Sequence, residues 1–425
     1  LWVPVARPLI SWFFLVSGLV VLICLIPGKP YDRALQGAVG HVVGQGQRFD
    51  ERDIVFARVR MNPAGSPAQS EVYRRYYAAH PEKEADDAKR RAKGLLGTAG
   101  SIDNGWPPKV AMMHAGFDLP DFLGPRAEAL PTPDRSAFGL DPARAANMVK
   151  NLARHLGADG VGICEVNALW TYSHRGEIHF DNFDDWGREI GILPRFAVVF
   201  LTEMKWEHVS AAPHTPTVAE SANDYAKGAY LGTYLAAWFS HMGYRAVAQN
   251  TRRYDTLLAP LAVDAGLGEV GRCGYLIAHR YGARVRVFAT LTDMPLVPDA
   301  PISLGVDEFC RRCKKCAEAG PSHAIPQGEK VVFNGVEKWK LNAETCFELW
   351  GKMGTDCSIC MAVCPFSRPD TFSHRLVRLL VAHALVPKVL FPLLDNLIYG
   401  KKWKPRRVSP WLVWPKAGEV GKADD

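Results

Sequence analysis

The 425-residue chain is long enough for about two or three domains, and its composition, 48% hydrophobic and 22% charged, excludes a largely disordered protein. Its formal net charge of +7 is modest for this length and fits a membrane surface or an acidic partner rather than nucleic acid. Seven of the ten cysteines lie between Cys310 and Cys364, which suits metal ligation better than a disulfide framework.

The first element is an uncharged run, LISWFFLVSGLVVLICLI, from Leu9 to Ile26, which a Pro-Gly pair ends. Its eighteen residues predict a single N-terminal transmembrane helix, an anchor over 1–28, with a buried core helix as the alternative. A signal peptide would have a shorter apolar run and a small-residue cleavage site. The basic residues Lys29 and Arg33 follow the run, which favours a catalytic domain on the cytoplasmic side of a bacterial inner membrane.

Residues 29–140 are rich in turn signals and are expected to wrap around a core that begins at Asp141. A charged stretch within them, His80 to Lys93, predicts a solvated helix. Apolar spacing predicts a helix over 141–157, capped by Asp141. Strands are predicted at 159–166, 195–204 and 284–293, and a long helix at about 221–241. Helices that alternate with strands favour an α/β sandwich core over 141–305.

A glycine-rich stretch, GLGEVG, matches the dinucleotide-binding pattern G-x-G-x-x-G. That fold needs a strand before the glycines and a helix after them, whereas the preceding YDTLLAPLAVDA predicts a helix, so we reject NAD binding. Glycine still lets the backbone approach a bulky, phosphate-bearing cofactor closely, so Gly266, Gly268 and Gly271 are candidate cofactor contacts.

The cysteine module occupies 306–370. Its first run has three of the four cysteines of the iron–sulfur pattern C-x2-C-x2-C-x3-C-P, and Gly320 stands at the fourth position. In two-cluster ferredoxins the fourth cysteine of each run ligates the other run's cluster. The first predicted set is therefore complete: Cys310, Cys313, Cys316 and Cys364. The second set has only three cysteines: Cys346, Cys357 and Cys360.

The first set predicts one 4Fe-4S cluster, and the crossed spacing and both prolines favour iron–sulfur over zinc. The second set would hold a 3Fe-4S cluster, or a 4Fe-4S cluster with a non-standard ligand such as water, Asp, Cys164 or Cys273, or nothing. Cys24, Cys164 and Cys273 stand alone and are expected to be buried. The tail, 371–425, is apolar and then basic with tryptophans, which fits a membrane interface or a segment packed on the domain.

Several segments together resemble the cobalamin-dependent reductive dehalogenases: DGVGICEVNALWTYSH, VDAGLGEVGRCGYL, YGARVRVFATLTDMPLVPD and the two cysteine runs. RFDERDIVFAR and YYAAHPEK resemble the N-terminal region of that family, so the resemblance covers roughly 45–370. It implies an α/β (α+β), nitroreductase-like core that holds a base-off corrinoid, beside a two-cluster bacterial ferredoxin-like module. It also implies that low-valent cobalamin reductively dehalogenates an organohalide, with electrons delivered through two iron–sulfur clusters.

The family's proton donor is a tyrosine about nineteen residues before the glycine–tyrosine that ends a long helix, which is Tyr225 here. Tyr230, Tyr234 and Trp238 recur every four residues and predict a core-facing stripe, whereas Tyr225 lies off that register. We expect Tyr225 near the start of the helix, where the helix dipole would stabilise a phenolate.

A phenol with an ordinary pKa near ~10 needs a neighbouring cation to cycle its proton. The resemblance implies a Lys or Arg in that role, and Arg284 and Arg286 share one face of the predicted strand. Position counting favours Arg284 and leaves Arg286 open. Asn250 matches a polar active-site position of the family.

The chain departs from the family at Gly320, and it shows neither a twin-arginine signal nor an appended flavin reductase domain. We therefore expect a separate electron donor, which would be a ferredoxin, a flavodoxin or a membrane quinol-linked protein. The other expected partners are the organohalide, the membrane and a possible second copy of the chain, without nucleic acid.

Two alternatives share part of this pattern. An epoxyqueuosine reductase-like tRNA enzyme predicts a broad basic surface, no anchor and an Asp acid in place of the tyrosine. A membrane-bound ferredoxin-type electron carrier needs only the cysteines and leaves the α/β core unexplained.

Overall fold

The computed structural model describes residues 25–93, 107–129, 136–176 and 185–406, together with Trp12, Leu15, Gly18, Leu19 and Leu22. Within these residues, no helix combines the length and the apolar character needed to cross a membrane. Much of the predicted anchor, and Cys24 with it, lies outside the described residues, so the transmembrane helix stays a prediction.

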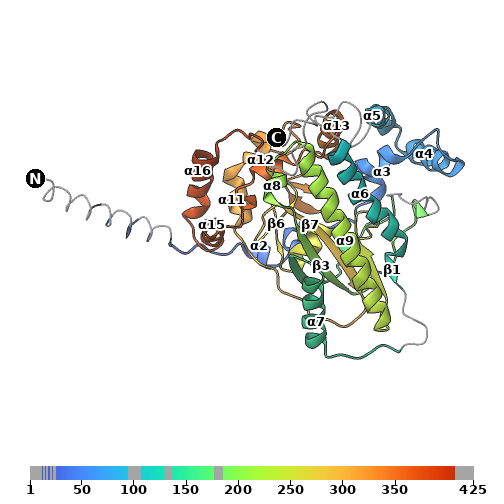
Figure 1. Cartoon of the computed structure of the whole chain (residues 1–425), viewed down its shortest axis with the longest axis horizontal. Helices are drawn as coiled ribbons and strands as arrows, with labels where there is room; N and C mark the ends of the chain where they lie inside the picture. Colours follow the sequence, from blue (N-terminus) through green and yellow to red (C-terminus); the bar gives the residue numbers. More distant parts are fainter. Residues whose placement is uncertain are drawn as a thin grey trace, which may run out of the picture.

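The centre of the molecule is a five-stranded sheet with the strand order β1-β4-β7-β3-β2 (Figure 1). Its strands are β1 (Glu128–Ala129), β2 (Gly160–Glu165), β3 (Phe196–Glu203), β4 (Ala246–Gln249) and β7 (Val285–Thr292). The three predicted strands are confirmed. Every neighbouring pair is antiparallel, so the core is α+β rather than a parallel α/β sandwich. The helix α9 (Thr215–His241) connects β3 to β4, but these two strands are not neighbours. The strand β7 lies between them and is antiparallel to both.

Helices cover both faces of this sheet because residues of each strand alternate between them. Phe196, Val198 and Phe200 of β3 pack against α7 (Pro142–His155) and α9 (Thr215–His241). Ala197, Val199 and Leu201 pack on the opposite face, against α10 (Leu258–Asp264) and the hairpin of β5 (Gly268–Val270) and β6 (Leu276–Ala278). The sheet is therefore the buried layer of the core, and its α9 face carries the site described below.

The sequence predicted the start of α7 correctly and the start of α9 too late in the chain. The side chain of Asp141 accepts a 2.9 Å hydrogen bond from the backbone N–H of Arg144, so the predicted cap of α7 is confirmed. The helix α9 begins at Thr215, with Pro216 in its first turn, and is therefore longer at its N-terminal end than the predicted 221–241.

The cysteine module packs on one end of the core. Its helices and strands are α11 (Val306–Cys313), α12 (Lys315–Ala319), β8 (Val331–Phe333), β9 (Val336–Lys338), α13 (Ala343–Met353), α14 (Ile359–Val363) and the short η6 (Pro365–Ser367). The helices α12 and α14 pack against each other, which brings the first cysteine run next to the second. The short α8 (Trp206–Val209) packs against both α9 and α14.

The segment before the core lies over one side of the molecule. It comprises α2 (Asp32–Leu35), η1 (Ala38–His41), η2 (Glu51–Asp53), α3 (Val55–Arg60), α4 (Pro67–Ala79), α5 (Pro81–Ala92), α6 (Pro107–Leu123) and η3 (Gly124–Arg126), and η4 (Ala168–Trp170) follows β2. The helix α6 lies along α9 (Figure 1). The charged helix α5 is only partly solvated, since its Asp87 and Arg90 are buried.

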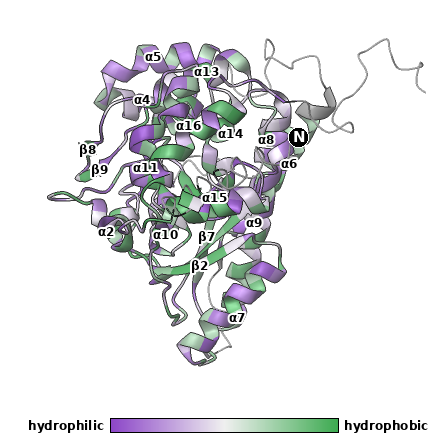
Figure 2. Ribbon diagram, turned by 90° about the vertical axis from the view of Figure 1, so that its left-hand side faces the viewer, coloured by the Kyte–Doolittle hydropathy of each residue, from purple (hydrophilic) through white to green (hydrophobic). Residues whose placement is uncertain are grey.

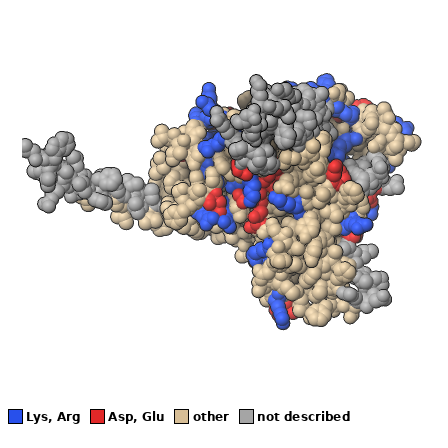
Figure 3. Space-filling model, viewed as in Figure 1, with Lys and Arg blue, Asp and Glu red and all other residues tan. Residues whose placement is uncertain are grey.

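The chain continues after the module into two consecutive helices, α15 (Phe372–His383) and α16 (Pro387–Tyr399). They lie against α11 on the side of the molecule opposite α4 and α6 (Figure 1). On the face seen in Figure 3, Lys and Arg are interspersed with Asp and Glu rather than gathered into one broad basic surface.

Candidate active site

A cavity of about 490 Å³ lies between the α9 face of the sheet and the cysteine module. The helices α3, α6, α9 and α13, the strand β7 and the loop before α14 all contribute to its wall. Aromatic side chains form much of that wall: Phe56, Phe117, Tyr225, Tyr275, Phe347 and Trp350. The volume and the largely apolar lining with a few polar groups are typical of a small-molecule site.

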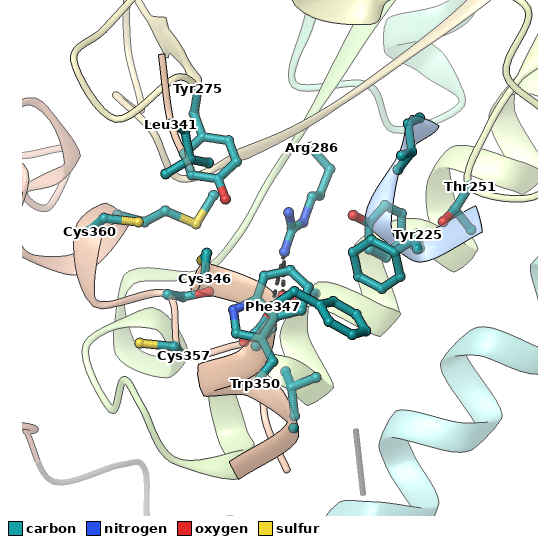
Figure 4. A pocket seen from close by; sticks show the side chains of 18 of the residues that line it. Tyr225, Thr251, Tyr275, Arg286, Leu341, Cys346, Phe347, Trp350, Cys357 and Cys360 are labelled. Carbon is teal, nitrogen blue, oxygen red and sulfur yellow. Dashed lines mark hydrogen bonds and ion pairs between the residues drawn. The ribbon is translucent and has the colours of Figure 1, made fainter. Parts of the chain in front are cut away.

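Tyr225 and Arg286 face each other inside this cavity. The guanidinium carbon of Arg286 lies 4.9 Å from the centroid of the Tyr225 ring, and both residues line the cavity (Figure 4). Burial alone would lower the pKa of Arg286, but the phenol of Tyr225 and the carboxylate of Asp356 raise it above its ordinary value. The arginine is therefore a permanent cation beside the phenol.

Two further polar groups hold Arg286 in place. Its Nη2 donates to the hydroxyl of Ser221 at 2.6 Å and to Oδ2 of Asp356 at 3.3 Å, and the Ser221 hydroxyl donates to the same carboxylate oxygen at 2.6 Å. Ser221 and Asp356 are 1% and 7% exposed, so these bonds form in a site from which water is largely removed. Because Asp356 directly precedes Cys357, this network joins the tyrosine to the second cysteine set.

Arg284 was the favoured partner of Tyr225, and the structure shows that this prediction is wrong. Because β7 begins only at Val285, Arg284 lies in the turn before the strand and does not share the face of Arg286. Its side chain is fully buried, donates to the Ser367 carbonyl at 2.6 Å and forms a 2.9 Å ion pair with Glu203.

The expected surroundings of Tyr225 also need correction. Because α9 begins at Thr215, Tyr225 lies nearly three turns inside the helix, too far from its start for the helix dipole to act on the phenol. Tyr230 and Tyr234 are each 45% exposed, so they do not form the predicted core-facing stripe.

Asn250 is fully buried at the end of β4, next to the cavity residues Thr251 and Arg252. Its Oδ1 accepts from the backbone of Arg252 at 3.0 Å, and its Nδ2 has no hydrogen-bond partner. It is not part of the cavity wall formed by the described residues, so its role stays a prediction.

The three glycines lie elsewhere, and none of them lines the cavity that the described residues form. A Cβ atom would approach Ala300 O to 2.4 Å at Gly266 and Ile277 O to 2.3 Å at Gly268. A Cβ at Gly271 would meet the Ile277 side chain at 2.8 Å. These positions therefore exclude a side chain because of the chain's own packing, which does not support the predicted cofactor contact.

The cysteines of the first set influence one another strongly. Burial raises the pKa of the Cys310 thiol well above its ordinary value, and Cys364 and Cys313 raise it further. Burial likewise raises the pKa of Cys316, where Cys310 and Cys364 also contribute. Cys310 and Cys364 also pack in the same apolar cluster. This is compatible with the crossed pattern, and the ligation itself stays a prediction.

The cysteines of the second set line the cavity. Cys346, Cys357 and Cys360 all belong to its wall, together with Gly320 and Tyr275 (Figure 4). Burial raises the pKa of Cys360 well above its ordinary value, and Cys357 and Cys346 contribute to this rise. Among the described residues, no group of three or more His, Cys, Asp or Glu side chains is arranged to hold a single metal ion.

Cys164 and Cys273 are buried, as expected, whereas Cys24 lies outside the described residues. Cys164 donates to the Leu261 carbonyl at 3.4 Å on the α10 face of the sheet, away from the module. Cys273 packs in the same apolar cluster as Cys310, Cys357 and Cys364, and burial raises its pKa to about 12.

The residues fit the cofactors that the sequence implies. The crossed cysteine sets provide thiolates, the usual ligands of iron–sulfur clusters. Among the described residues, two buried polar atoms beside the cavity have no hydrogen-bond partner, namely Nε of Arg286 and Oδ1 of Asp356, and they could bond to the polar substituents of a corrinoid.

Sequence reasoning missed Ser221, Tyr275 and Asp356. Ser221 is four residues before Tyr225 and therefore on the same helix face, which was a usable signal. Asp356 is next to a predicted cysteine ligand. No feature of the sequence distinguished Tyr275.

Comparison with known proteins agrees with this architecture. Residues 309–367 match the family model described as a 4Fe-4S dicluster domain. The tetrachloroethene reductive dehalogenase of Dehalobacter restrictus is 33% identical over 279 residues, which are 55% of this chain and 50% of that protein. The enzyme of the same name from Sulfurospirillum multivorans is 32% identical over 296 residues, covering 62% of this chain and 58% of that protein.

Among solved structures, the catabolic reductive dehalogenase NpRdhA matches with a TM-score of 0.65 and 25% identity, over 90% of this chain and 54% of that one. The epoxyqueuosine reductase of Aliivibrio fischeri is 25% identical over 257 residues, 52% of this chain and 67% of that protein.

The fold is thus that of a reductive dehalogenase, with a ferredoxin-like dicluster module on a mixed α and β core. In sequence the chain is similar to reductive dehalogenases and, at lower identity, to an epoxyqueuosine reductase. It spans about half the length of the curated relatives that it matches.

Proposed function

We propose that this chain reductively dehalogenates an organohalide at a corrinoid held in the cavity. The observation that carries the proposal is the wall of that cavity, in which the second cysteine set and the pair of Tyr225 and Arg286 face one space. In the net reaction, two electrons and one proton convert the carbon–halogen bond into a carbon–hydrogen bond and release halide.

The two cysteine sets would hold two iron–sulfur clusters. Cys310, Cys313, Cys316 and Cys364 would hold a 4Fe-4S cluster. Cys346, Cys357 and Cys360 would hold a second cluster beside the cavity, either a 3Fe-4S cluster or a 4Fe-4S cluster with a non-standard ligand. A bound low-valent corrinoid supplies the electrons that break the carbon–halogen bond.

The chain's own residues supply the proton and the environment. The Tyr225 hydroxyl would donate the proton to carbon, and the cation of Arg286 would stabilise the resulting phenolate. Asp356 and Ser221 fix the arginine, so its position does not have to change when the proton leaves. The aromatic wall would exclude water and strengthen this charge pairing.

Electrons would enter at the first set, cross to the second and reach the cavity. They would come from a separate donor, namely a ferredoxin, a flavodoxin or a membrane quinol-linked protein. We further propose that the run Leu9–Ile26 anchors the chain in a bacterial inner membrane, with the catalytic part in the cytoplasm. A homodimer is compatible with this arrangement.

The test is halide release by protein reconstituted with corrinoid, iron and sulfide, with reduced viologen as donor. Because the similar proteins are named for tetrachloroethene and one neighbour's structure contains 3-bromo-4-hydroxybenzoic acid, both compounds are suitable probes. Chloride or bromide release that requires corrinoid is the expected result. Protein that takes up no corrinoid, or that holds it and releases neither halide, would contradict the proposal.

The greater identity to dehalogenases than to epoxyqueuosine reductase, and the tyrosine in the cavity, favour this function over a tRNA enzyme. A simple electron carrier would have no need of a cavity between its second cysteine set and an arginine–tyrosine pair.

A further inference from the structure

We propose that the outer faces of α15 and α16 rest on the surface of an anionic lipid bilayer. The two helices would form a second contact with the membrane beside the N-terminal run. This inference extends the membrane anchor proposed above and does not depend on the reaction in the cavity.

Ordinary surface helices are apolar toward the core and polar outside, whereas α15 and α16 are apolar on both sides. Val377, Val381 and Phe391 pack on the core, and other apolar residues face outward. In α16, Val389, Leu393 and Leu397 recur every four residues and are 46%, 64% and 81% exposed. In α15, Leu376 and Leu379 are 44% and 51% exposed. The exposed side of both helices is therefore largely apolar. Both helices lie on the side of the molecule that faces the viewer in Figure 2.

Three charged residues of the same helices are buried, whereas Arg375 of α15 stays exposed and pairs with Asp370. Asp395 is 8% exposed and accepts from Nε of Arg368 at 2.9 Å. Lys388 is 2% exposed and pairs with Glu308, and Arg378 donates to Asp370 at 2.8 Å. Ion pairs thus fix these helices to the module and leave the leucines outside. The ion pairs keep the leucines on the outer side. An exposed apolar surface of this kind typically contacts a membrane or another protein.

The place where the described end of the N-terminal run meets the protein indicates that a bilayer covers the exposed surface of α15 and α16. The backbone N–H of Gly28 donates to the His383 carbonyl at 2.8 Å, and that of Leu385 donates to the Ile26 carbonyl at 3.1 Å. The described end of the run, at Ile26, therefore lies at the junction between α15 and α16. If the run enters a membrane, the two helices reach its surface as well.

The charges at the border of this surface fit anionic headgroups. Lys401, Lys402 and Lys404 follow α16 directly and are exposed. In Figure 3 the surface over α15 and α16 is mostly uncharged, with Lys and Arg at its edge. Leucines that enter the acyl boundary and lysines that meet phosphates are the pattern of an interfacial membrane contact.

This contact would orient the enzyme. The helix α16 packs on α11, which carries Cys310 and Cys313, whereas α6, α9 and α13 around the cavity lie on the far side (Figure 1). A donor in the membrane would therefore meet the first cysteine set, and the organohalide would reach the cavity from the side away from α15 and α16.

The test uses the full chain with its reconstituted cofactors, bound to phosphatidylcholine vesicles that contain about a third phosphatidylglycerol. A fraction of the lipids carries a photoactivatable diazirine on the acyl chain, and mass spectrometry maps the adducts. We expect adducts on 376–397 as well as on the N-terminal run. The double variant Leu393→Glu, Leu397→Glu should lose about tenfold of the adducts on α15 and α16 and keep those on the run.

Ile192, which is 92% exposed and remote from these helices, provides the matched control: Ile192→Glu should leave every adduct unchanged. Cluster absorption verifies that each variant is folded. Adducts confined to the run would overturn the proposal, as would cross-links between two copies through α15 and α16 in place of lipid adducts. Halide release with reduced viologen is measured in parallel, so its absence would count against the proposed reaction and not against this surface.

Discussion

Arg286 of β7 lies over the ring of Tyr225 of α9, with 4.9 Å between the guanidinium carbon and the ring centroid. The sheet register sets this contact. Arg286 is opposite Thr202 of β3 and two residues before Phe288, which packs on the same α9 face. The contact places a fixed cation beside the phenol that we propose as proton donor.

Tyr225→Phe is expected to lower halide release by roughly 100-fold or more, the usual contribution of a positioned general acid. The ring itself should stay in place, because it packs against Phe117 and Phe288 at centroid distances of 5.7 Å and 6.1 Å. Steady-state halide release measures the loss, and the absorbance of the corrinoid shows whether cofactor reduction is unchanged. Normal turnover in this variant would exclude Tyr225 as the proton donor.

Arg286→Gln and Arg284→Gln should differ in turnover per folded molecule. The first removes the cation beside Tyr225 and should lower turnover per folded molecule, and it should also destabilise the protein because Asp356 is left buried without this partner. The second leaves Glu203 without its 2.9 Å partner and should lower the free energy of unfolding by about 3–5 kcal/mol. Denaturant unfolding and turnover per folded molecule separate the two effects. Equal loss of turnover in both variants would contradict this assignment.

Gly320→Cys should complete the second cysteine set. Gly320 has a φ of −70°, which any residue adopts, and a Cβ there would meet only Cys316 O, at 3.1 Å. Electron paramagnetic resonance of oxidised protein should lose any three-iron signal, while reduced protein gains a second four-iron signal. Gly328→Cys serves as the control, because a Cβ there meets nothing within 4 Å and the position is outside both sets. An identical spectrum in the two variants would show that position 320 does not reach the second cluster.

Asp87→Ala should strongly destabilise the protein. Asp87 is fully buried and accepts from Arg58 at 2.7 Å, from Arg90 at 2.7 Å and from Tyr77 at 3.1 Å. Its loss leaves two buried arginines without this partner, which should cost about 3–5 kcal/mol in denaturant unfolding. Asp86→Ala on the same helix removes only an exposed pair with Lys89 and should leave the unfolding midpoint unchanged. A similar midpoint in both variants would argue against a structural role for this network.

Asp224 should make stability depend on pH. Burial raises the pKa of this carboxyl from 3.8 to about 7. Between these values the folded protein holds a proton that the unfolded chain has lost, so its stability falls as the pH rises from about 4 to about 7. The free energy of unfolding of Asp224→Asn should decline less than that of the unsubstituted protein over this window. Parallel curves for the two proteins would rule out this titration.

The sequence alone identified the features that depend on local pattern. The three long strands and the cap of α7 follow from residue type and spacing, because periodicity is a local property. The crossed cysteine sets also rest on local spacing, and they stay a prediction. The position of Tyr225 came from the resemblance. The apolar and basic composition of 371–425 predicted a membrane interface or a packed segment, but not the helices α15 and α16.

Only the tertiary structure decided which residues meet. A spacing of two places Arg284 and Arg286 on one face only if both belong to the strand, and β7 begins between them. The antiparallel sheet depends on β7 inserting between β3 and β4, a long-range pairing that no local window contains. The network of Ser221, Asp356 and Arg286, and the buried charges of α15 and α16, join segments far apart in the chain. The sequence determined which chemical groups are present, and the packing of distant segments determined which of them share a site.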